Sequence, residues 1–291
     1  MPRPNVLCFG EILWDCLPEG RFLGGAPLNV SYHLAQLGCA AWPVSSVGDD
    51  ALGRELLDRL QGWQLLTELI GVHPTAATGT VEVSLDDGQP TFDIVNDVAW
   101  DYIALPGELP QQCEPVDAVL FGSLAERSAT NRESLQELLH AAPQALKVFD
   151  VNLRPPHDDL ARVRALASNA DLIKINDDEA AALLGIDSPL QDFEAAARAV
   201  AEQLDCESVC LTGGSIGAGL LHHGEWHWVA AVPVTVRDTI GAGDAFLATL
   251  IHGLLTAPQA SSATLQRAAA IASFVAGCDG ATPAYQPEDF A

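Results

Sequence analysis

The sequence predicts an α/β protein, a three-layer α/β/α sandwich in which helices cover both faces of a central, mostly parallel sheet. Short runs rich in β-branched and aromatic residues alternate along the 291 residues with longer stretches rich in alanine and leucine, the pattern of a buried parallel sheet. The composition agrees, because 48% of the residues are hydrophobic and 18% are charged, so the chain can bury enough apolar surface to fold. Between residues 78 and 95 the period changes to two, which predicts an additional small β-sheet.

The first part of the chain contains two strand–helix pairs with recognisable ends. Residues 6–10 form a short apolar run that is typical of a buried strand. The next helix has apolar residues at helical spacing and stops at Gly38, since glycine is a common terminator. The second helix carries its charges on one face. The predicted strands are 6–10 and 41–47, and the predicted helices are 28–37 and 51–60.

The second half repeats the alternation more plainly, as expected for parallel strands joined by helices. The predicted strands are 118–121, 146–151, 172–175 and 208–211, and the predicted helices are 131–140, 159–168, 178–184 and 195–203. Strand-like runs also flank a turn at Gly224-Glu225. Two further helices are predicted at 241–256 and 261–276, and we expect the second, largely apolar one to pack against the sheet.

Two predicted hairpins interrupt this alternation of strands and helices. Residues 78–86 alternate with period two, and Asp87-Gly88 separates them from the run 91–95, which predicts an antiparallel hairpin. A second hairpin is predicted around Glu19-Gly20. We expect these segments, about 11–24 and 76–98, to form a β lid on a single domain spanning 1–291, because lids exclude water and close over substrate. An ordinary surface hairpin is the alternative reading of the same pattern.

The charge excludes several classes of function. Fourteen basic residues face 39 acidic ones, for a formal net charge of −25, and this balance argues against nucleic-acid binding.

No apolar run reaches the roughly 20 residues that a membrane span requires. The apolar stretch near the start is short and contains Glu11, unlike a signal peptide. Seven cysteines without a Cys-x-x-Cys pair are expected to be reduced, so we expect a cytoplasmic protein.

The strongest functional signal is the glycine-rich segment Asp238-Thr239-Ile240-Gly241-Ala242-Gly243-Asp244, which leads into a predicted helix. Small residues let the backbone approach a ligand closely, and the first amides of a helix are unpaired donors, so this segment predicts an anion site. A carboxylate is not expected beside a bound phosphate unless it takes part in the chemistry. Asp244 is therefore a candidate general base, although a helix cap is the alternative, because Asp favours the first turn.

A second small-residue turn, Gly24-Gly25-Ala26-Pro27-Leu28-Asn29, also opens a predicted helix. Asn29 falls in the first turn, where its amide can hydrogen-bond a hydroxyl group of a ligand. The alternative is a helix that begins at proline and has a polar first turn, which is a common arrangement.

Together these segments resemble the two signatures of the PfkB (ribokinase-like) sugar kinases. Residues 24–48 are similar to the first signature, and 238–246 to the second with its Asp-Thr-x-Gly-Ala-Gly-Asp core. Asn176-Asp177-Asp178-Glu179 is similar to the family's Asn-x-x-Glu motif, and Thr212-Gly213-Gly214 resembles its nucleotide-side loop. The resemblance covers essentially the whole chain, and it implies the ribokinase-like form of the predicted fold.

The resemblance also implies a role for each matching position. Asp244 would be the catalytic base, beside an anion hole formed by the turn at Gly241 and the amides of Ala242, Gly243 and Asp244 itself. Sugar hydroxyls would be bound by Asp15, Gly24, Gly25 and Asn29. Asn176 and Glu179 would organise Mg²⁺ and the ATP phosphates through water, and Thr212 and Gly214 would border the nucleotide. A potassium ion could bind backbone carbonyls near Asp238, Ile240 and the segment 277–280.

Arg154 is a further candidate, because it follows a predicted strand at the edge where α/β sheets bind ligands. As one of few cations in the chain, it could reach a transferring phosphate. A surface ion pair is the alternative for this residue.

Within the family, the opening Gly10-Glu11-Ile12-Leu13-Trp14-Asp15, Pro27 and Gly122-Ser123-Leu124 most resemble fructokinases. The resemblance implies an ATP- and Mg²⁺-dependent enzyme that converts D-fructose to fructose 6-phosphate and dimerises through its lid. A ketodeoxygluconate kinase or ribokinase of the same family, and a non-catalytic sugar or nucleotide sensor, remain alternatives. The sequence contains neither a P-loop motif nor a Gly-x-Gly-x-x-Gly fingerprint, which argues against a P-loop kinase and a nicotinamide oxidoreductase.

Overall fold

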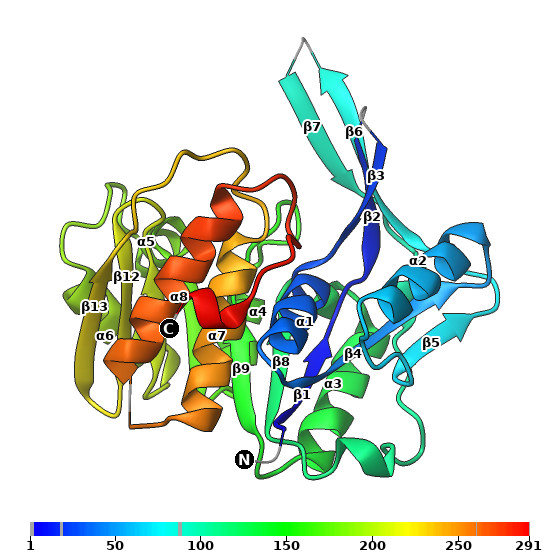
Figure 1. Ribbon diagram of the computed structural model, residues 1–291, viewed down its shortest axis with the longest axis horizontal. Coiled ribbons are helices and arrows are strands. Elements are labelled where there is room, and N and C mark those ends of the chain that lie inside the picture. Colours follow the sequence, from blue (N-terminus) through cyan, green and yellow to red (C-terminus); the bar gives the residue numbers. More distant parts are fainter. Residues whose placement is uncertain (1–2, 18–19, 87–88, 260, 291) are drawn as a thin grey trace.

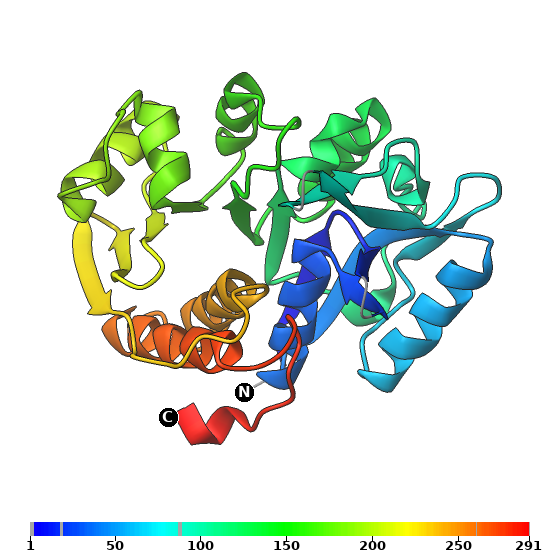
Figure 2. The same ribbon diagram turned by 90° about the horizontal axis from the view of Figure 1, so that it is seen from above.

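A large, mostly parallel sheet runs through the molecule (Figures 1 and 2), and its order places β1 in the interior. The computed structural model describes residues 3–17, 20–86, 89–259 and 261–290. The strands of this sheet are β1 (Asn5–Phe9), β4 (Ala40–Gly48), β5 (Ile70–His73), β8 (Ala118–Gly122), β9 (Leu146–Asp150), β10 (Leu172–Asn176), β11 (Val209–Thr212), β12 (Gly217–His222) and β13 (Glu225–Ala230). Their order is β13-β12-β11-β10-β9-β8-β1-β4-β5, and the neighbours from β11 to β5 pair in parallel.

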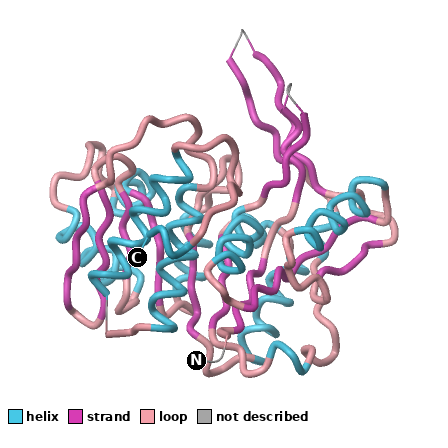
Figure 3. The backbone as a smooth tube through the Cα atoms, in the orientation of Figure 1, coloured by secondary structure: helices cyan, strands magenta, loops and turns pink. Residues whose placement is uncertain are grey.

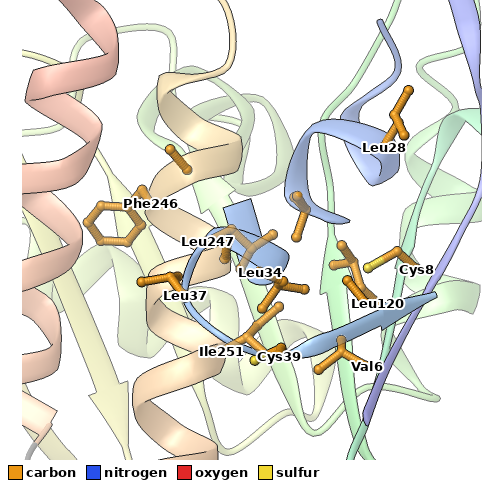
Figure 4. Packing of buried hydrophobic residues seen from close by; sticks show 14 of the residues in the cluster. Val6, Cys8, Leu28, Leu34, Leu37, Cys39, Leu120, Phe246, Leu247 and Ile251 are labelled. Atoms are coloured by element: carbon orange, nitrogen blue, oxygen red, sulfur yellow. The ribbon is translucent and has the colours of Figure 1, made fainter. Parts of the chain in front are cut away.

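Helices cover both faces of this sheet, as the sequence predicts. The helices are α1 (Ala26–Gln36), α2 (Ala51–Gly62), α3 (Ala129–Ala141), α4 (Leu160–Ala167), α5 (Asp177–Leu184), α6 (Phe193–Leu204), α7 (Ala242–Thr256) and α8 (Ser261–Ala276). Side chains alternate along β1, because successive residues of a strand point to opposite faces. Val6 and Cys8 join a core with α1, α2, α7 and α8, whereas Leu7 and Phe9 join a core with α3 to α6. Figure 4 shows Val6 and Cys8 near side chains of α1 and α7.

The two predicted hairpins form a separate small sheet. Its strands are β2 (Leu13–Leu17), β3 (Gly20–Gly24), β6 (Gly79–Asp86) and β7 (Gln89–Ile94), in the order β3-β2-β6-β7. Both hairpins are antiparallel, and parallel pairing of β2 with β6 joins them. The predicted turn residues Glu19, Asp87 and Gly88 lie outside the described residues. The small sheet projects from the main body (Figures 1 and 3).

A buried ion pair fixes the chain where it returns from the small sheet to the main body. Arg127 Nε donates to Asp101 Oδ1 at 2.7 Å, and its Nη2 donates to Asp101 Oδ2 at 2.8 Å and to the Val95 carbonyl at 2.7 Å. Asp101 Oδ2 also accepts from the Val98 N–H at 3.1 Å. The guanidinium lies 3.8 Å from the centre of the Trp100 ring. Every charged atom of this pair therefore has partners.

The sequence-based elements match the observed ones except at one edge of the large sheet. The apolar helix predicted at 261–276 is α8 and packs against the sheet, and the strand-like runs around Gly224-Glu225 are the β12–β13 hairpin. β5 was not predicted from the sequence; it is short and only partly buried. None of the helices in the described ranges is long and apolar enough to cross a membrane.

Candidate active site

The polar residues singled out in the sequence gather at one edge of the large sheet. Because β1, β8, β9, β10 and β11 are parallel, their carboxyl ends meet at this edge, where open α/β sheets bind ligands. The first turns of α1 and α7 meet there as well, since a side chain from each helix joins in a hydrogen bond. The topology thus brings together residues from the two ends of the chain.

The start of α7 is shaped by Gly241. Its φ of +79° lies in the left-handed region, and a Cβ at this position would come within 2.5 Å of the Ala281 backbone, so only glycine fits without strain. The turn uses the Ala242 N–H, which donates to the Thr239 carbonyl at 3.3 Å. Among the described residues, the amides of Gly243 and Asp244 have no such partner. The amides of Gly243 and Asp244 are therefore free to donate to an anion, whereas the predicted third donor, Ala242, is engaged within the turn.

Asp244 lies in the first turn of α7 and meets the first turn of α1. Asn29 Nδ2 donates to Asp244 Oδ2 at 2.8 Å. Burial raises the pKa of Asp244 to about 6, and the nearby charge of Asp150 adds to this, while Asn29, Lys174 and Arg154 oppose it. A carboxyl with a pKa near 6 is ionised at neutral pH and still basic enough to accept a proton in a reaction.

A buried lysine lies beneath this turn, and the sequence analysis missed it. Lys174 Nζ donates to Asp150 Oδ1 at 2.9 Å, and both side chains are buried. A Cβ on Gly243 would lie 3.6 Å from this nitrogen, so the ammonium is close to the free amides. Burial would lower the pKa of Lys174, but the carboxylates of Asp150, Glu179 and Asp244 outweigh burial and raise it. The site therefore contains a permanent positive charge among three acidic groups.

Asn176 and Glu179 form a reciprocal cap at the start of α5. Asn176 Oδ1 accepts from the Glu179 N–H at 2.8 Å, and Glu179 Oε2 accepts from the Asn176 N–H at 3.0 Å. Glu179 Oε1 accepts from the Leu153 N–H at 2.7 Å, which ties α5 to the loop after β9. Each carboxylate oxygen keeps a second lone pair. Both oxygens can therefore accept a further hydrogen bond, including one from water.

The residues expected to bind sugar hydroxyls lie at the base of the small sheet. A Cβ on Gly24 would meet Asp15 Oδ2 at 2.2 Å, which places the carboxylate over this turn. Gly25 has a φ of +108°, and a Cβ there would lie 2.3 Å from the Glu11 carbonyl oxygen. Burial raises the pKa of Asp15 to about 6. The described residues show no hydrogen bond from Asp15 to Asn29 or Asp244.

Glu11 is a second residue that the sequence analysis did not assign to the site. Its Oε1 accepts from the Ala26 N–H at 3.1 Å, at the turn before α1. Burial raises the pKa of this carboxyl to about 7, Arg154 lowers it, and Asp244 raises it. Glu11 therefore lies within the electrostatic reach of the proposed base, behind the glycine turn.

The remaining predicted residues lie around this centre. Thr212 ends β11 opposite Asn176 of β10, and Gly214 follows it in the turn to β12 with a φ of +51°. Arg154 is exposed and makes no ion pair among the described residues, so the alternative that it forms a surface ion pair is not supported. Its positive charge lowers the pKa of both Glu11 and Asp244.

The two segments expected to hold a potassium ion lie side by side. The Asp238 N–H donates to the Ala276 carbonyl at 3.3 Å, and Gly241 packs against Ala281. Asp238 Oδ1 accepts from the Ile240 N–H at 2.9 Å, which shapes the loop before α7. The loop before α7 and the chain after α8 are therefore in direct contact.

Comparison with known proteins shows which family has this sequence and this fold. The model of the pfkB family of carbohydrate kinases matches residues 19–288. The chain is 31% identical over 274 residues to a fructokinase of Klebsiella pneumoniae, covering 86% of this chain and 84% of that one. It superposes with a TM-score of 0.81 on a fructokinase of Xylella fastidiosa crystallised with ATP, which is 25% identical, covering 98% of this chain and 97% of that one.

The fold is shared more widely. A double-mutant fructokinase of Vibrio cholerae O395, crystallised with fructose, ADP and a potassium ion, gives a TM-score of 0.79 at 24% identity, covering 97% of this chain and 94% of that one. These likenesses confirm the predicted ribokinase-like fold. From the family match over residues 19–288 and the identity to curated fructokinases, this chain belongs to the pfkB family of carbohydrate kinases, phosphotransferases that act on a sugar hydroxyl.

Proposed function

We propose that this protein phosphorylates D-fructose to fructose 6-phosphate with ATP as the phosphoryl donor. The observation that carries the proposal is the start of α7, where a carboxyl with a raised pKa stands beside two unpartnered amides. The relative from Klebsiella pneumoniae is a fructokinase, and structural neighbours bind ATP or fructose with ADP. A ketodeoxygluconate kinase or ribokinase remains the alternative within the family. A sensor of sugars or nucleotides needs no base, so Asp244 argues against that class.

The chemistry of the proposed reaction is mainly positioning and charge neutralisation. The sugar lies between Asp15 and α1, with its attacking hydroxyl directed at Asp244. Asp244 takes the proton of this hydroxyl while the hydroxyl oxygen attacks the terminal phosphorus of ATP; the bond from that phosphorus to the bridging oxygen breaks, and ADP leaves with the electron pair. The free amides of Gly243 and Asp244 point to where negative charge develops on the phosphoryl oxygens, and in comparable sites loss of one such donor costs roughly 3–4 kcal/mol. Lys174, beneath this turn, adds a positive charge.

We further propose Mg²⁺ and K⁺ as the cations of this site. The residues fit Mg²⁺, because Glu179 keeps free lone pairs and Asp150 Oδ2 is buried without a hydrogen-bond partner among the described residues. When bound, this metal neutralises phosphate charge. K⁺ would be held by carbonyls of the two adjoining segments around 238–240 and 277–280, as suggested by the potassium ion in the Vibrio cholerae O395 structure. Thr212 and Gly214 would border the nucleotide, and Arg154 would face its phosphates.

We also propose that the small sheet acts as a lid on a single kinase domain and that two copies pair through it. β3 and β7 are its edge strands, and Phe22 of β3 is 46% exposed. Unpaired edges favour association with another strand. Sedimentation at micromolar concentration is expected to give a homodimer, and a monomer there would contradict this pairing.

The test of the proposed function is turnover by the purified protein and by its Asp244→Asn variant. ADP release from Mg²⁺-ATP is measured with fructose, glucose, mannose, ribose, ketodeoxygluconate and adenosine. We expect a high kcat/KM for fructose alone. Asp244→Asn should lower kcat by about 10²–10⁴-fold, because the amide cannot accept the proton, while calorimetry shows that fructose and ATP still bind. Near-normal kcat in the variant would exclude Asp244 as the base, and turnover of another sugar would replace fructose as the substrate.

A further inference from the structure

Asn29 has an unusual position for a residue expected only to bind substrate. Its side-chain amide belongs to the first turn of α1, yet it donates to the carboxylate of Asp244 in the first turn of α7 at 2.8 Å. Asn29 is 5% exposed, whereas Asp244 is only partly buried, so the bond lies at the inner side of the site. The two helices are thereby joined at the site by a hydrogen bond between residues far apart in the sequence.

The orientation of this amide is fixed by its neighbour. With Asp244 ionised, a reversed amide would place two acceptor oxygens against each other, so the NH₂ group must face the carboxylate. The amide oxygen, Oδ1, is buried and has no hydrogen-bond partner among the described residues. Leaving a buried acceptor unpaired is costly, and this indicates that the contact with Asp244 dominates the placement of Asn29.

The bond also gives the two carboxylate oxygens of Asp244 different surroundings. Asp244 Oδ2 is held by Asn29, whereas Oδ1 accepts no hydrogen bond from the described residues. A carboxylate that is held through one oxygen keeps the other at a fixed place, which is what a proton transfer within hydrogen-bond reach requires. A neutral donor suits this purpose, because a cation in the same place would make the base weaker.

We propose that Asn29 is a positioning residue of the phosphoryl-transfer step, which holds Asp244 Oδ2 so that Oδ1 faces the attacking hydroxyl. This inference rests on the proposed function, because it takes Asp244 to be the base. It goes beyond the expected contact between Asn29 and a sugar hydroxyl, since the second hydrogen of the amide can serve the sugar at the same time.

The role predicts a pH dependence with a definite sign. Activity requires ionised Asp244 and therefore falls as the pH drops through about 6. Asn29 stabilises the ionised form, so its loss raises the pKa of Asp244 and moves the acid limb of kcat to higher pH. The charged groups that act on Asp244 from the surrounding elements are Asp150 of β9, Arg154 of the following loop, Lys174 of β10 and Glu11 after β1.

The test compares Asn29→Ala and Asn29→Asp with the unchanged protein. Both variants should lower kcat, by about 10- to 100-fold for Asn29→Ala, with a smaller change in the KM for fructose. The acid limb should move to higher pH in Asn29→Ala and further in Asn29→Asp, because the second carboxylate repels the first. An NMR titration of the Asp244 carboxyl without substrate should show the same order of pKa values, even where turnover is lost.

Asn131→Ala is the matched control. Asn131 is also a buried asparagine, and it bonds Trp100, Ala125 and Ile103 away from the site, so its loss should lower the melting temperature without moving the acid limb. A raised KM for fructose with unchanged kcat and acid limb in the Asn29 variants would overturn the inference and leave Asn29 as a substrate contact. The proposed function fails separately, if the unchanged protein phosphorylates no sugar or if Asp244→Asn keeps its kcat.

Discussion

Two buried ion pairs in this molecule use their charges differently. In the pair at the base of the small sheet, Arg127 binds both oxygens of Asp101 and also a backbone carbonyl. In the pair beneath α7, Lys174 binds only Asp150 Oδ1, and Asp150 Oδ2 is buried without a partner among the described residues. An ammonium has three donors, and Lys174 uses one of them within the described chain. A pair with all its bonds made supports the fold, whereas one with spare donors and acceptors can serve a ligand.

The largest effect is expected from Lys174→Met, which should damage both stability and activity. It leaves Asp150 buried without its counter-charge, at a cost of about 3–5 kcal/mol of unfolding free energy. It also removes the positive charge beneath the free amides, so kcat should fall by about 100-fold or more. Thermal melting and steady-state kinetics measure the two effects.

The double variant Lys174→Met/Asp150→Asn isolates the stability effect. Because both charges are removed together, the melting temperature should recover, whereas kcat should stay low because Lys174 and a group proposed for the Mg²⁺ site are both lost. Recovery of kcat as well would show that Lys174 only neutralises Asp150, and the contrast between the two pairs would then disappear.

The second prediction concerns Arg127→Met at the other pair. Loss of the guanidinium leaves Asp101 uncompensated, so the unfolding free energy should fall by about 3–5 kcal/mol. The kcat of the folded enzyme should stay near its original value, because Arg127 serves structure. Urea unfolding and kinetics well below the melting temperature test this. A strong loss of kcat in a fully folded variant would place Arg127 in the catalytic machinery.

A smaller effect, of opposite sign, is expected from Glu11→Gln. The folded protein raises the pKa of Glu11 from 4.5 to about 7, so this carboxyl stabilises the fold when protonated, and that contribution is lost as the pH rises through 7. Glutamine stays neutral and still accepts the Ala26 N–H. The variant should therefore match the original protein at pH 4.5 and be more stable at pH 8, by up to about 3 kcal/mol.

Melting temperatures across this pH range decide the outcome for Glu11. Glu108→Gln, at an exposed position, is the control, and the difference in melting temperature between this variant and the original protein should not increase with pH. An equal difference between Glu11→Gln and the original protein at every pH would mean that Glu11 is not a buried carboxyl of the kind described.

The sequence predicts most of the fold because its signals are local. Gly38 ends the first helix with a φ of +92°, as a glycine terminator should, and the period-two stretch at 78–86 became β6. β5 was missed because its four residues, Ile70-Gly71-Val72-His73, are too few for a periodicity to be recognised and include a glycine. Its strand character comes from pairing with β4.

The site was predicted less completely, because much of it depends on contacts between distant segments. Asp244 and Asn29 were found through motifs, but the bond between them arises from the packing of α1 against α7. Lys174 stands opposite Asp150 in the register of β9 and β10, which no local pattern reveals. One signal was available, since Lys174 is one of two lysines in the chain and interrupts an apolar run. A charged residue in a buried strand is expected to have a partner of opposite charge, and this strand leads to Asn176.

The parallel pairing of β2 with β6 also constrains the order of folding. Leu13 pairs with Gly79, and α1, β4, α2 and β5 lie in the connection between them. Joining the two hairpins closes this long connection, and the loss of entropy in closing it comes before the new hydrogen bonds form. The small sheet is thus expected to assemble late and to open first, so its amide hydrogens should exchange with solvent while those of β1 and β8 stay protected.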